Sequence, residues 1–466
     1  MAPRAQTTPL VDAMRRLART IEWRWHTPGH KGRAPQGADF LAWEMDWTEV
    51  GALADPEGPW AQAERKAAER FGSRRSWFSV QGATLPVLVA ILAAFAPGSR
   101  VAVDRYAHRS VLSALILAGL FPKWLYPRWA PGGVPVPAAP NWEALAAETD
   151  GLVLTRPTYE GIALPRAALE AAILAYHRRG KPVVVDEAHG AHWWGRQGFP
   201  TSALAQGADL VVHGPHKTEP ALTQTGVLHW QGQHVDGDRI EAWWRRLATS
   251  SPSYLLLASL DHWLARWSEV GRAWEALAAR AGDEWRRLEA RGHQVWQLRA
   301  AEAGWEVDPA KLTLLGPGLR WRERLAPRHQ AEKADPGSIT FILAPHVPTG
   351  RLMAALGALF PEPPPAWTGE GWPEPPVRMA PREATEGPSR WVALDRAVGQ
   401  VAAEALVPYP PGVPLVCPGE EITPEVVAWA TAYQQAGTVA GMRAGAVRVV
   451  ESRTPGPRLS PDAALR

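Results

Sequence analysis

The residues best suited to chemistry are an aspartate and a lysine that lie thirty-one positions apart in the chain (217 − 186). Asp186 closes the apolar run 182–185, and Lys217 follows the apolar run 210–212. Such runs predict buried strands of a parallel sheet, and ligands of these sheets bind beyond the carboxyl ends of the strands. The acid and the amine are therefore predicted to face one crevice.

An acid and an amine in one crevice match the needs of pyridoxal phosphate. That cofactor requires a lysine that holds its aldehyde as a Schiff base and a carboxylate that keeps its ring nitrogen protonated. Only seven of the 50 Lys and Arg residues are lysine, and arginine stays protonated and cannot form an imine. A strand-end aspartate often only caps a helix, and a loop lysine usually lies in water, so the prediction depends on the pair.

Two further strings add candidate contacts for the same cofactor. QGATLPVL places Gly82, Ala83 and Thr84 at the start of a predicted helix, where free backbone N–H groups attract a phosphate. VDRYAHRS places His108 just beyond a strand, where its imidazole could stack on the cofactor ring. Each string also has a plainer interpretation, as a strand-to-helix turn or as a surface or satisfied core histidine.

The elements that must position these residues follow from short β-branched runs that alternate with longer amphipathic runs from residue 71 onward. This alternation predicts βαβ units, an α/β fold and a mostly parallel sheet in a large domain at 60–270. The predicted strands are residues 101–103, 152–155, 183–186 and 210–213, and the predicted helices are residues 85–96, 109–120 and 166–179.

The remaining sequence divides where its composition changes. Residues 1–59 are predicted to be an N-terminal arm that includes the turn-rich string HTPGHKGR. We expect linker helices and a smaller α/β domain at 271–360, a proline-rich connector at 361–376 and a C-terminal domain at 377–451. The tail at 452–466 is expected to be disordered.

Composition excludes several classes of function. The formal net charge is +3, and arginine is spread along the chain rather than gathered into a basic arm, so no nucleic-acid partner is expected. The longest apolar run, 85–96, is too short to span a membrane, and the N-terminus has no apolar signal core. The single cysteine, Cys417, excludes an intrachain disulfide and suits a reducing compartment. We expect a soluble, cytoplasmic protein.

Taken in order, the strings of this chain resemble the bacterial ornithine/lysine/arginine decarboxylases. The matching strings span nearly the whole chain and are HTPGHKG, DRYAHRS, PTYEG, VVVDEAHGAH, HKTEPALTQTG, TSSPSYLLLASLD and YPPGVPLVCPGEEIT. The resemblance implies the aspartate-aminotransferase-like fold (fold type I) of pyridoxal-phosphate enzymes, with a large domain and a smaller C-terminal α/β domain.

The resemblance also implies roles for matched residues in binding the cofactor. Lys217 would carry pyridoxal phosphate, Asp186 would pair with its ring nitrogen, and His108 would stack on the ring. His216 and Thr84 would help to hold the phosphate.

Other matched residues would contact the ring, the substrate or a second subunit. Ala188 would pack below the ring, and His189 would lie near the phenolic oxygen or the substrate carboxylate. Ser251 and Ser253 look like residues that reach a neighbouring subunit's site. A homodimer, or a higher oligomer, with shared active sites is therefore expected.

The chain departs from the family pattern at the phosphate site. Ala83 stands where a hydroxyl-bearing residue is usual, and Gly214 and Pro215 stand where Ser-Thr or a similar pair precedes the His-Lys string. Each lost hydroxyl removes a charge-assisted hydrogen bond of roughly 1.5–3 kcal/mol, so cofactor affinity could be reduced. The segment 48–58 also lacks the acidic residue that is usual in the family just before an Asp-Leu pair, which could alter a loop at the site.

The implied reaction is decarboxylation of a basic amino acid, which would be arginine, lysine or ornithine. Glu420 and Glu421 are candidates for contact with the distal cation of the substrate, although a solvated or structural pair of glutamates is as common. The chain begins almost directly at the HTPGHKG arm and so resembles the short biosynthetic form, which suggests polyamine synthesis.

Two other functions remain open from the sequence. The same fold and the Lys–Asp pair could run another pyridoxal reaction, such as transamination, because a fold does not determine which bond is cleaved. Alternatively, a catalytically impaired paralogue could serve as a scaffold or regulator, an idea motivated by the three departures at the phosphate site. The retention of Lys217, Asp186, His108 and His189 favours catalysis.

Overall fold

The computed structural model describes residues 22–25, 57–129, 135–363, 372–409, 412–436 and 438–451. The chain forms two compact units, the first made of Met1–Trp372 with Pro410–Val413 and the second of Pro373–Tyr409 with Pro414–Arg466. The predicted HTPGHKG arm, most of the segment 48–58 and the tail lie outside the described residues. The predicted boundary at residue 270 stays a prediction.

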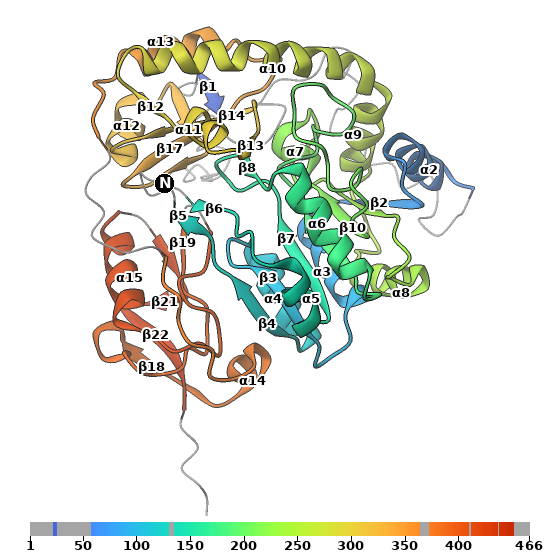
Figure 1. Cartoon of the computed structure of the whole chain (residues 1–466), viewed down its shortest axis with the longest axis vertical. Coiled ribbons are helices and arrows are strands. Elements are labelled where there is room, and N and C mark those ends of the chain that lie inside the picture. The colour runs from blue at the N-terminus through green and yellow to red at the C-terminus, as the bar shows by residue number, and fades with distance from the viewer. Residues whose placement is uncertain are drawn as a thin grey trace, which may run out of the picture. The chain divides into compact units, whose positions relative to one another are not determined.

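The first unit is built on a seven-stranded sheet with the strand order β2-β11-β10-β9-β7-β3-β4 (Figure 1). β11 is antiparallel to its neighbours β10 and β2, and the other neighbouring pairs are parallel. The predicted mostly parallel sheet is thus confirmed. The strands are β2 (Arg75–Ser79), β3 (Arg100–Asp104), β4 (Phe121–Leu125), β7 (Gly151–Thr155), β9 (Val183–Asp186), β10 (Leu210–His213) and β11 (Gly226–Trp230).

Alternate residues of these strands enter two separate apolar cores, because successive side chains of a strand point to opposite faces. In β9, Val183 and Val185 belong to one core and Val184 to the other. Helices cover both faces. The first core packs against α2 (Pro59–Phe71), α5 (Trp142–Glu148), α6 (Arg166–His177) and α9 (Tyr254–Ala265), and the second against α3 (Thr84–Ala94), α4 (Arg109–Ala118) and α8 (Gly237–Leu247).

The predicted helices are confirmed, but each ends two residues early. α3 stops at Ala94 because Phe95 takes an extended conformation ahead of Pro97 and Gly98. α4 stops because Gly119 adopts a left-handed conformation, with φ of 66°, and its N–H bonds back to the last turn. β11, which enters the sheet antiparallel, was not predicted.

A second layered region of the same unit follows the long helix α10 (Trp267–Glu289). Its sheet has four antiparallel strands in the order β12-β14-β17-β16, and tryptophans dominate its core, with Trp25, Trp274 and Trp321 fully buried. The elements are β12 (Gln294–Val295), α11 (Trp296–Glu302), β14 (Lys311–Leu315), α12 (Gly318–Leu325), β16 (Lys333–Ala334), β17 (Ser338–Ile342) and α13 (Thr349–Gly357).

Three short strand pairs and one short helix complete the first unit. β1 (Trp23–Trp25) lies parallel to β15 (His329–Ala331), a pairing that the sequence did not predict. The other elements are β5 (Arg128–Trp129) with β6 (Pro135–Val136), β8 (Ile162–Ala163) with β13 (Glu306–Val307), and α7 (Pro215–Thr218).

The second unit is a smaller α/β structure around the sheet β18-β22-β21. Its elements are α14 (Pro381–Glu386), β18 (Ser389–Ala393), the 3-10 helix η3 (Leu394–Arg396), β19 (Val407–Tyr409), α15 (Pro424–Ala436), β20 (Thr438–Ala440), β21 (Met442–Arg443) and β22 (Ala446–Val450). Cys417 is buried.

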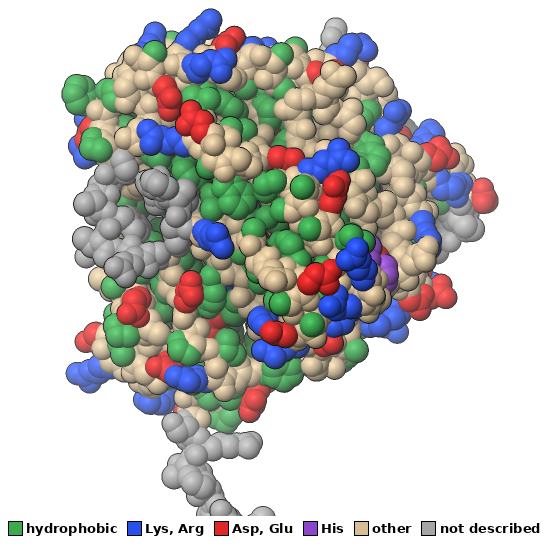
Figure 2. Space-filling view, in the orientation of Figure 1, with side chains coloured by type: hydrophobic (Ala, Val, Ile, Leu, Met, Phe, Trp, Pro, Cys, Tyr) green, Lys and Arg blue, Asp and Glu red, His purple; other side chains and the backbone are tan. Residues whose placement is uncertain are grey.

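The surface agrees with the balanced charge of the sequence. Figure 2 shows basic and acidic side chains mixed over the face that it draws. Among the described helices, none is long and apolar enough to cross a membrane.

Candidate active site

The two strands that carry the predicted acid and amine are direct neighbours. β9 ends at Asp186, which lies opposite Val212 of β10, and β10 ends at His213, four positions before Lys217. The chain then turns through Gly214 into the short helix α7, which contains Lys217. The fold thus brings Asp186 and Lys217 to the same end of two adjacent parallel strands, as predicted.

The surroundings change the pKa of both groups. Burial raises the pKa of Asp186, and the positive charge of Lys217 opposes part of that rise. Burial lowers the pKa of Lys217, while the charges of Asp186 and Glu332 act against it. A lysine whose pKa is lowered provides more of the neutral amine that attacks an aldehyde. Lys217 also remains partly accessible, as that reaction requires.

His108 lies at the end of β3 and caps α4. Its Nδ1 accepts a hydrogen bond from the backbone N–H of Ser110 at 3.2 Å and lies 2.8 Å from the Ser110 hydroxyl oxygen. Burial, together with the charges of Lys217 and Arg109, lowers the pKa of His108 to about 3. The ring is therefore neutral and lies near Lys217, which suits stacking on an aromatic cofactor.

His189 is held by a buried lysine from the four-stranded sheet. Lys311 Nζ lies 3.0 Å from Nδ1 of His189, and both residues are buried. Since the lysine ammonium can only donate, Nδ1 must accept and the ring proton must lie on Nε2. Nε2 is buried and has no hydrogen-bond partner among the described residues. Its N–H is thus available to an acceptor on a ligand.

Lys311 and His189 also have perturbed pKa values. Burial lowers the pKa of Lys311 to about 8, although the charges of Glu332 and Asp308 act in the opposite direction. Burial lowers the pKa of His189 well below its usual value, and the charges of Lys217 and Lys311 add to this effect. His189 therefore stays neutral at physiological pH.

The start of α3 forms an open cradle of backbone groups. Gly82 has φ of 67°, and its N–H donates to the carbonyl of Gln224 at 2.7 Å. Gly226 packs so closely that a Cβ there would lie 2.4 Å from the oxygen of Gly82. Ala83 caps α3 without a side-chain hydrogen bond, and Thr84 is exposed. The first N–H groups of α3 thus have no intrahelical acceptor and face an accessible surface.

The departures Gly214 and Pro215 have a structural reason. A Cβ at Gly214 would lie 2.9 Å from the carbonyl oxygen of Ala188 and 3.3 Å from Cδ of Lys217, so a side chain there would disturb the lysine. Pro215 occupies the first position of α7, where a missing N–H costs little. His216 follows and donates through Nδ1 to the carbonyl of Thr225 at 2.6 Å.

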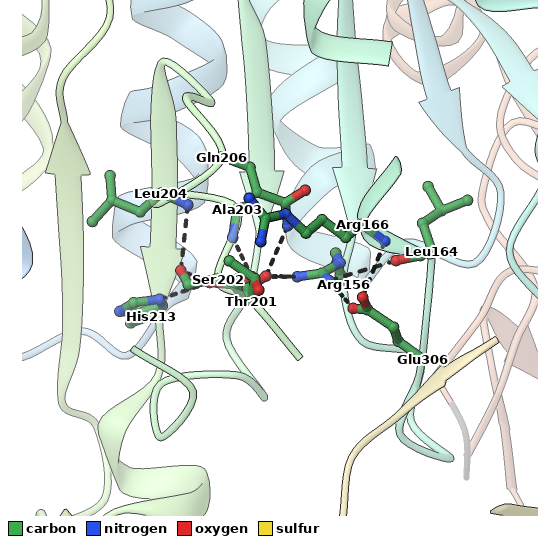
Figure 3. Close-up of polar contacts among 11 residues, drawn as sticks. Arg156, Leu164, Arg166, Thr201, Ser202, Ala203, Leu204, Gln206, His213 and Glu306 are labelled. Carbon is green, nitrogen blue, oxygen red and sulfur yellow. Dashed lines mark hydrogen bonds and ion pairs between the residues drawn. The ribbon is translucent and has the colours of Figure 1, made fainter. Parts of the chain in front are cut away.

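A buried network of hydrogen bonds holds the end of β9 next to Asp186. Glu187, the next residue, accepts from Arg156 Nη1 at 3.2 Å and from the N–H of Ala203 at 2.8 Å, and its other oxygen accepts from Ser202. Arg156 also reaches the carbonyl of Thr201 and the carboxylate of Glu306, as Figure 3 shows. Arg156 thus pairs with the buried Glu187 and with the partly exposed Glu306, so the buried charge of Glu187 has a partner of opposite sign.

The network continues through two histidines on β10 and β11. His213 Nε2 donates to Glu187 at 3.0 Å, because the carboxylate can only accept, and its Nδ1 then accepts from Nε2 of His229 at 3.1 Å. His229 Nδ1 in turn accepts from the hydroxyl of Ser76 at 2.8 Å. Burial lowers the pKa of His229 well below its usual value. These hydrogen bonds fix the orientation of both rings, and the lowered pKa keeps His229 neutral.

Some predicted site residues have local partners instead. Ser253 caps α9, and the N–H of Ser251 donates to the hydroxyl of Thr249. In the second unit, the carboxylate of Glu420 is buried and accepts from the N–H of Cys417 at 2.7 Å, and Glu421 pairs with Arg378 at 2.6 Å. A role of these four residues at the active site stays a prediction.

The sequence reasoning missed Lys311 and Glu187. The scarcity of lysine, which singled out Lys217, applies equally to Lys311 and Lys333, and all three have perturbing or pairing partners in the first unit. Lys333 pairs with the buried Glu160, which also accepts from the hydroxyl of Tyr106 at 2.8 Å. The rarity of lysine was thus a signal that could also have pointed to Lys311 and Lys333.

These residues fit pyridoxal phosphate. Asp186 is a carboxylate whose pKa is raised by burial, and a cationic ring nitrogen beside it would favour its charged form. The α3 cradle suits the phosphate, and the buried Nε2–H of His189 suits an oxygen acceptor. The site and the sheet define the class of pyridoxal-phosphate enzymes of fold type I.

Comparison with known proteins narrows this class. A family model described as Orn/Lys/Arg decarboxylase, major domain, matches residues 8–345, and its C-terminal domain model matches residues 373–439. The chain belongs to this family. It is a pyridoxal-phosphate-dependent amino-acid decarboxylase.

Individual relatives cover almost the whole chain. The uncharacterized protein YaaO of Bacillus subtilis is 33% identical and covers 90% of this chain and 93% of its own length. An arginine decarboxylase of the same organism is 30% identical and covers 91% and 92%.

Solved structures show the same fold. The constitutive lysine decarboxylase of E. coli has a TM-score of 0.70 at 22% identity and covers 96% of this chain and 82% of its own. A structure of SPT with PLP has a TM-score of 0.50 at 14% identity and covers 64% and 75%.

Proposed function

We propose that this enzyme decarboxylates a basic amino acid, with arginine as the preferred substrate and agmatine and CO2 as products, in polyamine biosynthesis. The convergence of Lys217, Asp186, His108 and His189 at one sheet edge carries the proposal. The choice of arginine rests on the relative of 30% identity that is named an arginine decarboxylase. The predicted cytoplasmic location would suit this role.

Pyridoxal phosphate, when bound, supplies a conjugated ring that accepts the electron pair left by the departing carboxylate. Asp186 holds a proton on the ring nitrogen and so keeps the ring electron-poor. The neutral His108 ring covers the cofactor and excludes water from the reacting face. The N-terminus of α3 would bind the phosphate of the cofactor.

Lys217 and His189 handle protons in this proposal. Because burial lowers the pKa of Lys217, its amine exchanges a proton more readily than an exposed lysine does, and it can protonate the α-carbon after CO2 leaves. His189, fixed by Lys311, donates from Nε2 to an oxygen of the cofactor or substrate.

We also propose that the active enzyme is a homodimer with shared sites. The segment before α9 lies beside the cradle, because Thr249 donates its N–H to the side chain of Gln81 at 2.8 Å. Ser251 in this segment is exposed. In a homodimer, Ser251 and Ser253 of this segment would reach the site of the neighbouring subunit.

A product assay tests the reaction and the substrate together. The protein is incubated with pyridoxal phosphate and equal concentrations of arginine, lysine and ornithine, and the amines are measured by mass spectrometry. We expect agmatine to dominate and the Lys217→Ala variant to give none. Dominant cadaverine or putrescine would refute arginine as the preferred substrate, and keto-acid products would indicate transamination.

The scaffold alternative has lost its main motivation. Gly214 and Pro215 are explained by close packing against Lys217 and by the start of α7. Ala83 leaves a cradle made of backbone groups. If wild-type protein that carries pyridoxal phosphate released no amine at all, the scaffold function would regain support.

A further inference from the structure

Two histidines and an aspartate meet beside the start of strand β10. The active site lies at the other end of this strand. Asp209 directly precedes β10, whereas Lys217 follows the other end of that strand. His177 ends α6, and His234 lies in the loop that precedes α8. Their ligand atoms all lie within 4.8 Å of one another.

Both imidazoles point at the same buried carboxylate. His177 Nε2 lies 2.8 Å from Oδ2 of Asp209, and His234 Nδ1 lies 3.0 Å from Oδ1. The two rings stack with centroids 4.1 Å apart. The side chain of Asp209 is fully buried, while about a fifth to a quarter of each histidine side chain is exposed (21% and 24%). The cluster is thus rigid at its base and open to solvent at its rim.

The surrounding chain is shaped to hold Asp209 in place. The carboxylate also accepts from the N–H of Val183 at 2.9 Å. Gly232 packs against it so closely that a Cβ would lie 1.6 Å from Oδ1. Hydrogen bonds from the backbone and from both histidines thus hold the Asp209 carboxylate in one orientation.

We propose that His177, Asp209 and His234 form a binding site for a divalent transition-metal ion, of which Zn²⁺ is the representative. Two imidazole nitrogens and one carboxylate are a ligand set that suits Zn²⁺, with solvent as the fourth ligand. Ligand atoms about 2.0–2.2 Å from zinc lie roughly 3.3 Å apart, so the two N···O distances need to widen by only about half an ångström.

The metal would replace the hydrogen bonds that His177 and His234 make to Asp209. Each imidazole can move its proton to the other ring nitrogen and offer a lone pair to the metal. The ion would tie the end of α6, the start of β10 and the loop before α8 together. Its role in this proposal is structural, because the active site lies at the opposite ends of the same strands.

Isothermal titration of the cofactor-loaded protein with Zn²⁺ tests the site. We expect one tight site per chain that is weakened by more than about 100-fold in His234→Gln and in His177→Gln, a larger loss than changes outside the ligand set cause. His346→Gln, which changes an exposed histidine elsewhere in the unit, is the matched control and should bind as the wild type does.

Thermal unfolding gives a second readout that does not depend on catalysis. Zn²⁺ should raise the unfolding temperature of the wild type and the control but not of His234→Gln, because a ligand stabilises only the state that binds it. The absorbance of the bound cofactor and the amine production should be the same in all these proteins. Absence of binding to the wild type, or equal binding to His234→Gln, would overturn the proposal.

Discussion

At the scale of single residues, the active-site groups are set by partners from distant parts of the chain. The proton position on His189 follows from Lys311, which lies 122 positions away in the sequence. The orientation of His213 follows from Glu187 and His229. Such partners have no local sequence signal, so the matched strings identified His189 and not Lys311.

Replacing Lys311 by methionine should impair catalysis more than folding. Without the donor at Nδ1, His189 can adopt either tautomer, and the loss of one buried hydrogen bond of about 1–1.5 kcal/mol should lower kcat/KM by about tenfold. The decline of activity as pH rises through about 8, where the Lys311 ammonium loses its proton, should disappear in the variant. Steady-state rates between pH 6 and 10 measure both effects.

Lys181 provides the matched control for this variant. Its Nζ donates to the carbonyls of Ala146 and Thr149 and contacts no site residue. Lys181→Met should keep the wild-type rate and pH profile. If both lysine variants lose activity equally, or if the alkaline decline persists in Lys311→Met, the positioning role of Lys311 is wrong.

At the scale of elements, the sequence predicted four strands of the seven-stranded sheet, which are β3, β7, β9 and β10, because their apolar runs are local. The same holds for the predicted helices α3, α4 and α6. It also placed Gly82, Ala83 and Thr84 at the start of a helix. It did not predict β11 or β1, because their places depend on pairing with distant strands. The close contact between Gly226 and Gly82 is likewise a property of the assembled sheet.

Gly226→Ala should weaken cofactor binding by disturbing the α3 cradle. The added methyl group would lie 2.4 Å from the Gly82 oxygen and 3.0 Å from the Ala83 nitrogen, so the start of α3 must shift. We expect the Kd for pyridoxal phosphate to rise by about tenfold, the equivalent of one lost phosphate hydrogen bond.

Gly350→Ala is the control, because a Cβ there meets no atom within 4 Å. It should leave the Kd unchanged. Fluorescence titration of the cofactor-free proteins measures both values. Equal affinity of Gly226→Ala and the wild type would show that the cradle does not bind the phosphate.

At the scale of the whole molecule, buried acids link the stability of the fold to pH. Glu64 of α2 accepts from the N–H of Phe78 in β2 at 2.8 Å, and burial raises its pKa to about 7. In the unfolded chain the same group has a pKa near 4.5. The folded state therefore binds its proton more tightly, and the stability gained below pH 4.5 is lost as pH rises through 7.

Glu64→Gln should remove this dependence, because the amide oxygen can still accept from Phe78 and does not ionise. Between pH 4.5 and 8, the free energy of unfolding of the wild type should fall relative to that of the variant. The relative fall should be about 3 kcal/mol at most. Urea unfolding at a series of pH values measures the difference. Parallel curves for the two proteins would contradict the assignment.

The proposed active site is tested most directly by identifying the lysine to which the cofactor is attached. The protein is loaded with pyridoxal phosphate, reduced with borohydride and digested, and the labelled peptide is sequenced by mass spectrometry. We predict a single label on Lys217. A label on Lys311, the buried lysine that contacts His189, would contradict this assignment. The absence of any label from the digest would also contradict it.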